Sequence, residues 1–166
     1  MAEKKQVEVL KTAILLERRG KAFYERVARD SASPAVADLF QLMAEEETKH
    51  IEYLSEQFVS FSANGTFLDA EPQGASESAV RQILNTDICD QISAASFEAA
   101  AISAAIEMEN RAVTVYSERA ESSDEPNEKK LYEWLAQWER GHLKFLAELN
   151  DELLEDVWYE SSFWPF

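Results

Sequence analysis

Two short stretches decide the fold: Ala-Glu-Glu-Glu-Thr-Lys-His at residues 44–50 and Ala-Gln-Trp-Glu-Arg-Gly-His at residues 136–142. Both contain Glu-x-x-His, and the two motifs are 92 residues apart. On an α-helix, side chains three positions apart point about 60° from each other and lie one turn along. Each stretch therefore predicts a helix that presents a carboxylate and an imidazole on one face.

The same offset of 92 residues relates a much longer part of the chain. Residues 105–146 align with residues 13–54 without a gap, and 13 of these 42 positions are identical. Any two amphipathic helices share apolar residues, but here Glu, Tyr, Pro and His also match. The identities are Ala13/Ala105, Ile14/Ile106, Glu17/Glu109, Arg19/Arg111, Tyr24/Tyr116, Ala28/Ala120, Ser31/Ser123, Pro34/Pro126, Leu39/Leu131, Ala44/Ala136, Glu47/Glu139, His50/His142 and Leu54/Leu146. The repeat predicts two copies of one helical hairpin.

Helical spacing of apolar residues gives the extent of the elements. The predicted helices run over residues 6–30, 34–61, about 92–121 and about 126–149. Ser33 suits the N-cap of the second helix, and Pro34 suits its first position. The sequence therefore predicts an all-α fold, an antiparallel four-helix bundle of two hairpins.

The connection between the hairpins is predicted to be long. Residues 62–77 hold two of the four glycines and are expected to be irregular, with a short helix near 77–86. We therefore expect a crossover over about 62–91 inside a bundle domain of residues 1–150. An aromatic tail of residues 151–166 follows it.

Composition excludes other classes of fold and partner. Four glycines and four prolines in 166 residues are too few for the turns of an all-β fold. A formal net charge of -16 disfavours nucleic acid and membrane surfaces as partners. A single cysteine, Cys89, cannot form an internal disulfide, and we find neither an export signal nor a long apolar span. We therefore expect a cytoplasmic protein.

Ionisable side chains are predicted inside the bundle. In each half a Glu precedes a Tyr by seven residues, a separation that returns to within about 20° of the same helix direction. The inward donors are Glu17, Glu47, His50, Glu109, Glu139 and His142. Burying such charges without compensation costs several kcal/mol per ion. Two divalent metal ions would neutralise the four carboxylates, whereas Arg19 and Arg111 lie beside the Glu/His direction. Carboxylates with imidazoles suit iron, manganese or zinc.

This ligand pattern resembles that of the ferritin-like superfamily, in which two helices each give a Glu and two others each give Glu-x-x-His. Residues 13–24, Ala-Ile-Leu-Leu-Glu-Arg-Arg-Gly-Lys-Ala-Phe-Tyr, and residues 44–50 look most like rubrerythrins, and the resemblance covers about residues 6–150. It implies a ferritin-like bundle with two iron ions, or manganese or a mixed pair. The residue roles that it implies are Glu17 and Glu109 as terminal ligands, Glu47 and Glu139 as bridges, His50 and His142 as one nitrogen donor per metal, and Tyr24 and Tyr116 as hydroxyls that orient the carboxylates.

The sequence departs from the rubrerythrin pattern in several places. The further Glu that rubrerythrins usually carry before the third-helix ligand is replaced by Ile106, and Glu107 is expected to be solvated. The remaining symmetric set is closer to bacterioferritin-type centres, but Thr48 stands where bacterioferritin has its haem-ligating Met, so haem is not implied. The Cys-x-x-Cys pairs of a rubredoxin-like domain are absent, which implies a separate, rubredoxin-like electron donor.

The resemblance implies a non-haem diiron oxidoreductase that reduces hydrogen peroxide or dioxygen, a reaction that relieves oxidative stress. Two alternatives stay open. One is a ferroxidase or iron-handling protein, which the loss of the Glu at Ile106 favours. The other is a metal-independent helical interaction module whose aromatic tail is the active surface.

Other conspicuous residues are expected to pack. Five of residues 158–166 are aromatic, so the tail should cover the bundle or join a second subunit in a homodimer or higher homo-oligomer. Trp134 and Trp138 flank Glu139 and are predicted to serve packing. Three further residues are predicted to fill the core: Met43, Met108 and Phe97. In the run Glu45-Glu46-Glu47, only Glu47 is expected to turn inward.

Overall fold

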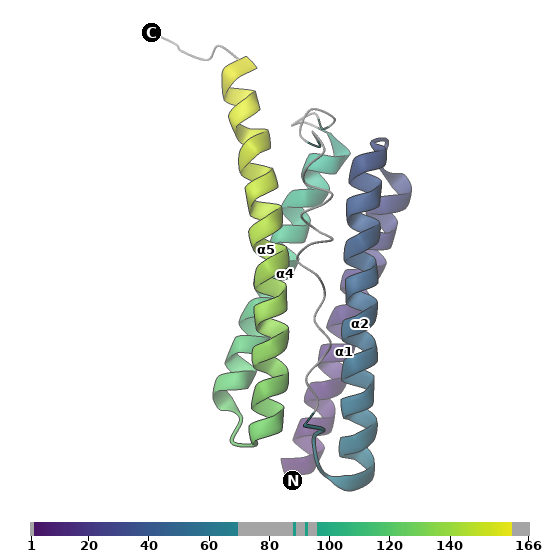
Figure 1. Cartoon of the computed structure of the whole chain (residues 1–166), viewed down its shortest axis with the longest axis vertical. Coiled ribbons are helices and arrows are strands. Elements are labelled where there is room, and N and C mark those ends of the chain that lie inside the picture. Colours follow the sequence, from purple (N-terminus) through teal and green to yellow (C-terminus); the bar gives the residue numbers. More distant parts are fainter. Residues whose placement is uncertain (1, 70–87, 89–91, 93–95, 161–166) are drawn as a thin grey trace.

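The computed structural model describes residues 2–69, 88, 92 and 96–160, and among them every regular element is a helix. The helices are α1 (Ala2–Asp30), α2 (Pro34–Asn64), α4 (Phe97–Ser122) and α5 (Pro126–Glu160). Figure 1 shows that α1 and α2 form one antiparallel hairpin and that α4 and α5 form the other. The predicted all-α bundle of two hairpins is confirmed.

The turn within each hairpin follows from the local sequence. Ser33 is the N-cap of α2, its hydroxyl accepts a hydrogen bond from the backbone N–H of Val36 at 3.3 Å, and Pro34 follows it as predicted. In the second hairpin the residue 92 positions later is Glu125, whose carboxylate accepts a hydrogen bond from the backbone N–H of Glu128. A carboxylate thus replaces the hydroxyl as helix cap.

The end of α2 requires a glycine. Gly65 has a φ of 70° and a ψ of 17°, the left-handed conformation in which a Cβ atom is unfavourable. Its N–H donates to the carbonyl oxygen of Phe61 at 2.8 Å and so satisfies one of the last carbonyls of the helix.

Four helix boundaries differ from the prediction, and one of them is the end of α2, at Asn64 rather than residue 61. α1 begins at Ala2 rather than residue 6, and α4 begins at Phe97 rather than about residue 92, because the hydroxyl of Ser96 caps it by accepting from the N–H of Ala99. α5 continues to Glu160, well beyond Leu149, because Leu153 extends the buried face of the helix by one turn.

Two predictions of burial were wrong. Phe97 is 50% exposed because it is the first residue of α4, at the end of the bundle. Glu46 is buried rather than solvated, and the Lys49 ammonium lies 2.7 Å from its carboxylate. The short helix expected near 77–86, Cys89, and the side chains of the aromatic tail from residue 156 onward lie outside the described residues.

Two apolar clusters fill the bundle, one toward each end. Repeat-related residues fall in opposite clusters: Tyr24 and Leu39 belong to one, while Tyr116 and Leu131 belong to the other. This exchange is the result expected when two similar hairpins pack about an approximate twofold axis. The Glu and His residues of the repeat lie between the two clusters.

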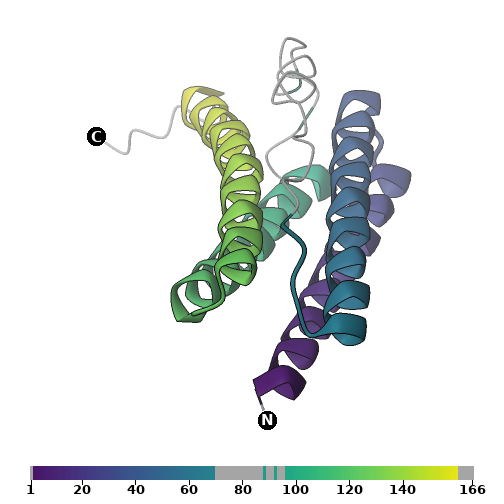
Figure 2. The same ribbon diagram turned by 60° about the horizontal axis from the view of Figure 1, so that its bottom comes forward.

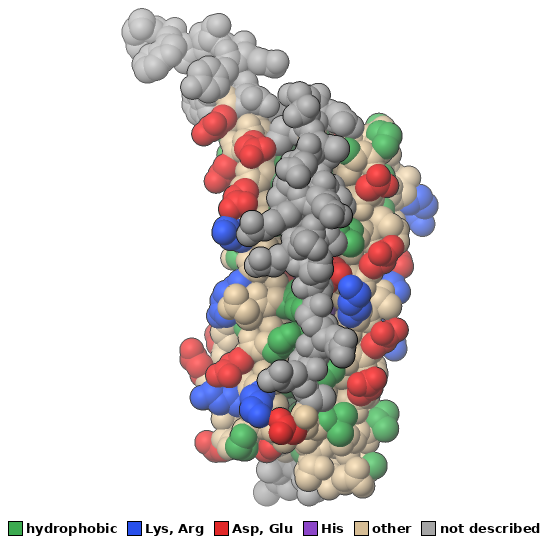
Figure 3. All heavy atoms as spheres, in the orientation of Figure 1, with side chains coloured by type: hydrophobic (Ala, Val, Ile, Leu, Met, Phe, Trp, Pro, Cys, Tyr) green, Lys and Arg blue, Asp and Glu red, His purple; other side chains and the backbone are tan. Residues whose placement is uncertain are grey.

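The two hairpins lie side by side, with the end of α5 continuing beyond the other helices in Figure 1, and Figure 2 shows α1 next to α4. Figure 3 shows acidic and basic side chains over the outer faces of α5 and α2. No helix among the described residues is long and apolar enough to cross a membrane.

Candidate metal centre

Six donors that the sequence predicts to point inward meet at the middle of the bundle. All six are at most 6% exposed: Glu17 on α1, Glu47 and His50 on α2, Glu109 on α4, and Glu139 and His142 on α5. They form two groups in which one ligand atom per residue lies within 4.8 Å of the others. Glu17 and His50 belong to one group, Glu109 and His142 belong to the other, and Glu47 and Glu139 are shared by both.

Carboxylates converge on one nitrogen of each histidine. The Nδ1 atom of His50 lies 3.0 Å from Glu17 Oε2, 3.1 Å from Glu139 Oε1 and 3.5 Å from Glu47 Oε2. The Nδ1 atom of His142 lies 3.1 Å from Glu139 Oε2 and 3.5 Å from Glu109 Oε1. A single proton on a ring nitrogen cannot satisfy so many oxygens at once, whereas a cation among them can contact all of them.

A tyrosine from the opposite hairpin supports each outer glutamate. The Tyr24 hydroxyl donates a hydrogen bond to Glu109 Oε1, and the Tyr116 hydroxyl donates one to Glu17 Oε1. Burial and the nearby carboxylates raise the pKa of both phenols well above 10, so both remain protonated donors at neutral pH. The family resemblance implies that these tyrosines orient carboxylates, and the structure gives the hydrogen-bond partner of each.

A small residue on α1 packs against one shared carboxylate. A Cβ atom at Gly20 would lie 3.4 Å from the carboxylate carbon of Glu47. The repeat-related residue on α4 is Ala112, which is also small and buried. A small residue three positions after the outer Glu in both halves is the sequence signal for this close approach.

The metal-free cluster carries more negative charge than burial allows. Burial and the carboxylates of Glu17 and Glu139 raise the pKa of Glu47 well above its usual range, and burial and Glu139 raise that of Glu109 to about 7. Burial alone would lower the pKa of His142, but its hydrogen bonds to Glu109 and Glu139 outweigh this and raise it to about 10. Protons therefore take the place of a positive charge that the cluster needs.

The donor set fits two metal ions. Four carboxylates and two imidazoles match the oxygen and nitrogen preferences of iron and manganese. Two divalent cations would cancel the charge of the four carboxylates, and the shared positions of Glu47 and Glu139 suit bridging ligands.

Aromatic rings enclose the outer side of one histidine. The rings of Trp134 and Trp138 meet the His50 ring edge to face, with centroids 5.6 Å and 5.3 Å away. The two indoles also contact each other, with centroids 5.0 Å apart. Both tryptophans serve packing, as predicted, but the sequence did not indicate that they pack on a candidate ligand.

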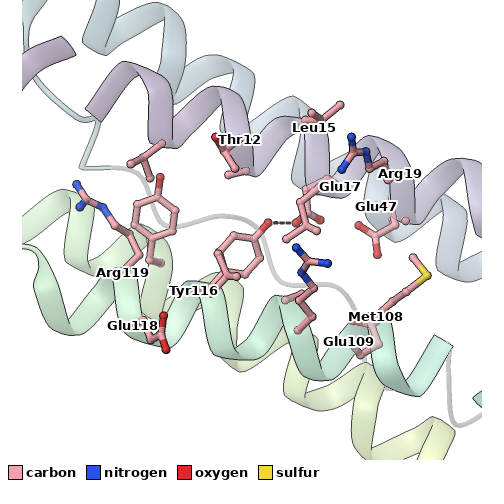
Figure 4. A pocket seen from close by; sticks show the side chains of 18 of the residues that line it. Thr12, Leu15, Glu17, Arg19, Glu47, Met108, Glu109, Tyr116, Glu118 and Arg119 are labelled. Carbon is pink, nitrogen blue, oxygen red and sulfur yellow. Dashed lines mark hydrogen bonds between the residues drawn. The ribbon is translucent and has the colours of Figure 1, made fainter. Parts of the chain in front are cut away.

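A cavity of about 780 Å³ opens between α1 and α4 and reaches this cluster. Glu17, Glu47 and Glu109 lie at its inner end, and Figure 4 shows Glu17 and Glu47 beside Arg19. Glu107 does not line it and is exposed, as predicted. The cavity connects the cluster with solvent.

A four-helix bundle with a buried Glu/His cluster shared among its helices defines a ferritin-like protein with a candidate dimetal carboxylate site. The chain belongs to the rubrerythrin family, whose model matches residues 8–150. Proteins of this family typically bind iron, and the family indicates an oxidoreductase in general terms.

Comparison with solved structures supports the fold. The chain is similar to a hypothetical protein from Pyrococcus furiosus, with 26% sequence identity, a TM-score of 0.63, and coverage of 93% of this chain and 94% of that one. None of the curated proteins matches the chain.

Proposed function

We propose that this chain holds two iron ions in the Glu/His cluster and reduces hydrogen peroxide or dioxygen with electrons from a separate, rubredoxin-like donor. The observation that supports this most strongly is the sharing of Glu47 and Glu139 between the two donor groups. Two separate mononuclear sites would not need shared carboxylates, whereas a pair of adjacent ions does.

In this proposal Glu17 and Glu109 would be the outer ligands, Glu47 and Glu139 would be shared by the two ions, and His50 and His142 would give one nitrogen each. When bound, the pair of ions supplies the two electrons that convert peroxide to water. Manganese or a mixed pair would satisfy the same donors.

The remaining residues would hold the ligands and control access. Tyr24 and Tyr116 donate hydrogen bonds that fix the orientation of the outer carboxylates. Trp134 and Trp138 cover the outer side of His50 and exclude water there. The cavity between α1 and α4 leads a small substrate to Glu17, Glu47 and Glu109.

A ferroxidase or iron-handling role is the second candidate. Ile106 is partly buried against an apolar cluster, so the α4 turn before Glu109 offers an apolar group at that position. The site would then have six donors and no further Glu to hold oxidised iron, so oxidised iron could leave it. Repeated oxidation of added ferrous iron beyond two ions per chain, without an electron donor, would favour this role.

The test compares metal content and peroxide reduction in matched variants. Glu47→Ala and His142→Ala should lose stoichiometric metal and all peroxide reduction, because each removes a donor from the cluster, while circular dichroism stays helical. Glu107→Ala is the control, since Glu107 is exposed on α4 only two residues from Glu109. In an anaerobic assay the ferrous wild type should consume one peroxide per pair of iron ions.

Two results would contradict the proposal. If Glu47→Ala still held two metal ions per chain, the assignment of Glu47 as a ligand would be wrong. Wild-type protein that holds no metal after reconstitution would instead favour a metal-independent interaction module.

A further inference from the structure

The cavity between α1 and α4 is far larger than peroxide or dioxygen requires. Its volume is about 780 Å³, whereas one water molecule occupies about 30 Å³ in the liquid. Sites for organic ligands in proteins usually measure about 300–1,000 Å³. The size of the cavity therefore fits an organic molecule.

The walls of the cavity are apolar along most of their length. Leu15 and Leu16 on α1 face it together with Ala112 and Val115 on α4. Leu15 is 48% exposed and Val115 is 39% exposed, although both are large aliphatic residues. The wall from Val9 to Arg19 follows about 15 Å of helix axis. This elongated, apolar space suits a linear hydrocarbon chain.

Two solvent-exposed arginines line the cavity near its metal-site end, one on each wall. Arg19 and Arg111 are repeat-related, and both line the cavity. Among the residues that the structure describes, no carboxylate pairs with either guanidinium. Arg119, which also lines the cavity, differs because it forms an ion pair with Glu128. Two unpaired guanidinium groups beside an apolar channel favour a ligand with an anionic head, and Arg binds carboxylates through paired hydrogen bonds.

We propose that this cavity binds a linear monocarboxylate, with the carboxylate between Arg19 and Arg111 and the chain along Leu16 and Val115 toward Val9. The proposal rests on the metal centre proposed above, because Glu17, Glu47 and Glu109 would otherwise repel the anionic head. Figure 4 shows Arg19 beside Glu17 and Glu47, so the head would lie close to the metal ligands. The bound chain would cover the access route to the centre.

The experiment is calorimetric titration of metal-loaded, full-length protein with hexanoate, octanoate and decanoate. The dissociation constant should fall about fourfold for each added methylene, the equivalent of about 0.8 kcal/mol per CH₂. Decanol should bind at least about tenfold more weakly than decanoate, because it lacks the charge that the arginines recognise. Removal of metal with a chelator should also weaken decanoate binding.

Matched variants locate the site. Arg19→Gln and Arg111→Gln should each weaken decanoate binding about tenfold, as expected for loss of charge-assisted hydrogen bonds. Arg18→Gln should leave it unchanged, because Arg18 is exposed on the same helix and does not line the cavity. Val115→Asp should weaken binding, and Val59→Asp, on exposed α2 surface, should not.

Several outcomes would overturn the proposal. Protein that holds two metals and binds no decanoate contradicts this inference alone, whereas protein without metal contradicts the metal centre and this inference with it. Equal binding of decanol and decanoate, or an equal effect of Arg18→Gln and Arg19→Gln, also contradicts it. A third outcome is that the wild type is a dimer that does not bind decanoate and that Val115→Asp dissociates this dimer in sedimentation experiments. This outcome would identify the cavity as an interface between two copies instead.

Discussion

The hydroxyl of each buried tyrosine at the centre reaches across the bundle to a glutamate of the other hairpin. Tyr24 donates to Glu109, and Tyr116 donates to Glu17. Each ring packs in an apolar cluster, so packing fixes the hydroxyl before any metal binds. The two contacts are related by the repeat and should matter equally.

Removing either hydroxyl should weaken metal binding. Tyr24→Phe and Tyr116→Phe each leave an outer carboxylate without its donor, and loss of such a supporting hydrogen bond typically costs about 10–100-fold in metal affinity. The ring remains packed, so the fold should be unchanged. Chelator competition measures the affinity, and the two variants should give similar values.

Tyr132→Phe is the control for this pair. Tyr132 is as buried as Tyr24, and its hydroxyl has no hydrogen-bond partner among the described residues. Its removal should leave metal affinity unchanged. If all three variants bound metal equally well, the supporting role of Tyr24 and Tyr116 would be wrong.

At this scale the sequence predicted the residues but not their partners. Glu17 and Tyr24 share a helix face, yet seven residues span about 10.5 Å along a helix, which is too far for a hydrogen bond. The crossed contacts depend on how the two hairpins dock, and docking is not encoded in the spacing on one helix. The six inward donors could be predicted because burial and the repeat give the same answer for each.

Among the elements, the first turn of α4 is attached to the turn between α1 and α2. Glu98 accepts hydrogen bonds from the backbone N–H of Ala32 at 2.9 Å and from the Ser31 hydroxyl at 3.0 Å. In the second hairpin Glu128 accepts from the Ser123 hydroxyl at 2.7 Å. The serines are repeat-related, but the carboxylates come from different helices, so the repeat could not predict these contacts.

Replacing Glu98 should reduce stability in a pH-dependent way. The backbone N–H of Ala32 and neighbouring hydrogen bonds lower the pKa of Glu98 below its ordinary value of 4.5. A carboxyl with a lowered pKa in the folded state stabilises the protein above pH 4.5 and loses this effect as the pH falls through the folded-state pKa. Glu98→Gln should therefore lower the free energy of unfolding at pH 7 by about 0.5–1 kcal/mol, with solvent screening keeping the value small.

Urea unfolding at pH 7 and pH 3 measures this difference. It should be smaller at pH 3, because below pH 4.5 the unfolded state takes up the proton and the stabilisation from the lowered pKa of Glu98 is progressively lost. Glu107→Gln, an exposed Glu on the same helix, should show no comparable change. A difference of the same size at both pH values would exclude the charged hydrogen bonds as its cause.

Across the whole molecule, a layer of ionisable groups separates two apolar clusters. Four carboxylates in that layer are nearly inaccessible to water, and unneutralised charge there costs several kcal/mol per ion. The repeat predicted this arrangement because it placed equivalent donors in both halves. It could not predict the open cavity, which depends on the separation of α1 from α4, or the continuation of α5 to Glu160.

Removing metal should destabilise the whole bundle. A ligand that binds only the folded state stabilises it by about 2.7 kcal/mol per site at a free concentration of 100 times its Kd. Urea unfolding with and without ferrous iron or manganese should show this increase for the wild type. Glu47→Ala should show no such increase, and an equal increase in both proteins would place metal binding elsewhere.

The most direct test is an anomalous diffraction map from crystals grown anaerobically with ferrous iron. We predict two peaks about 3.5–4 Å apart, both between Glu47 and Glu139, with one peak next to Glu17 and His50 and the other next to Glu109 and His142. A map in which these six side chains contact only one another, with no iron between them, would contradict the account.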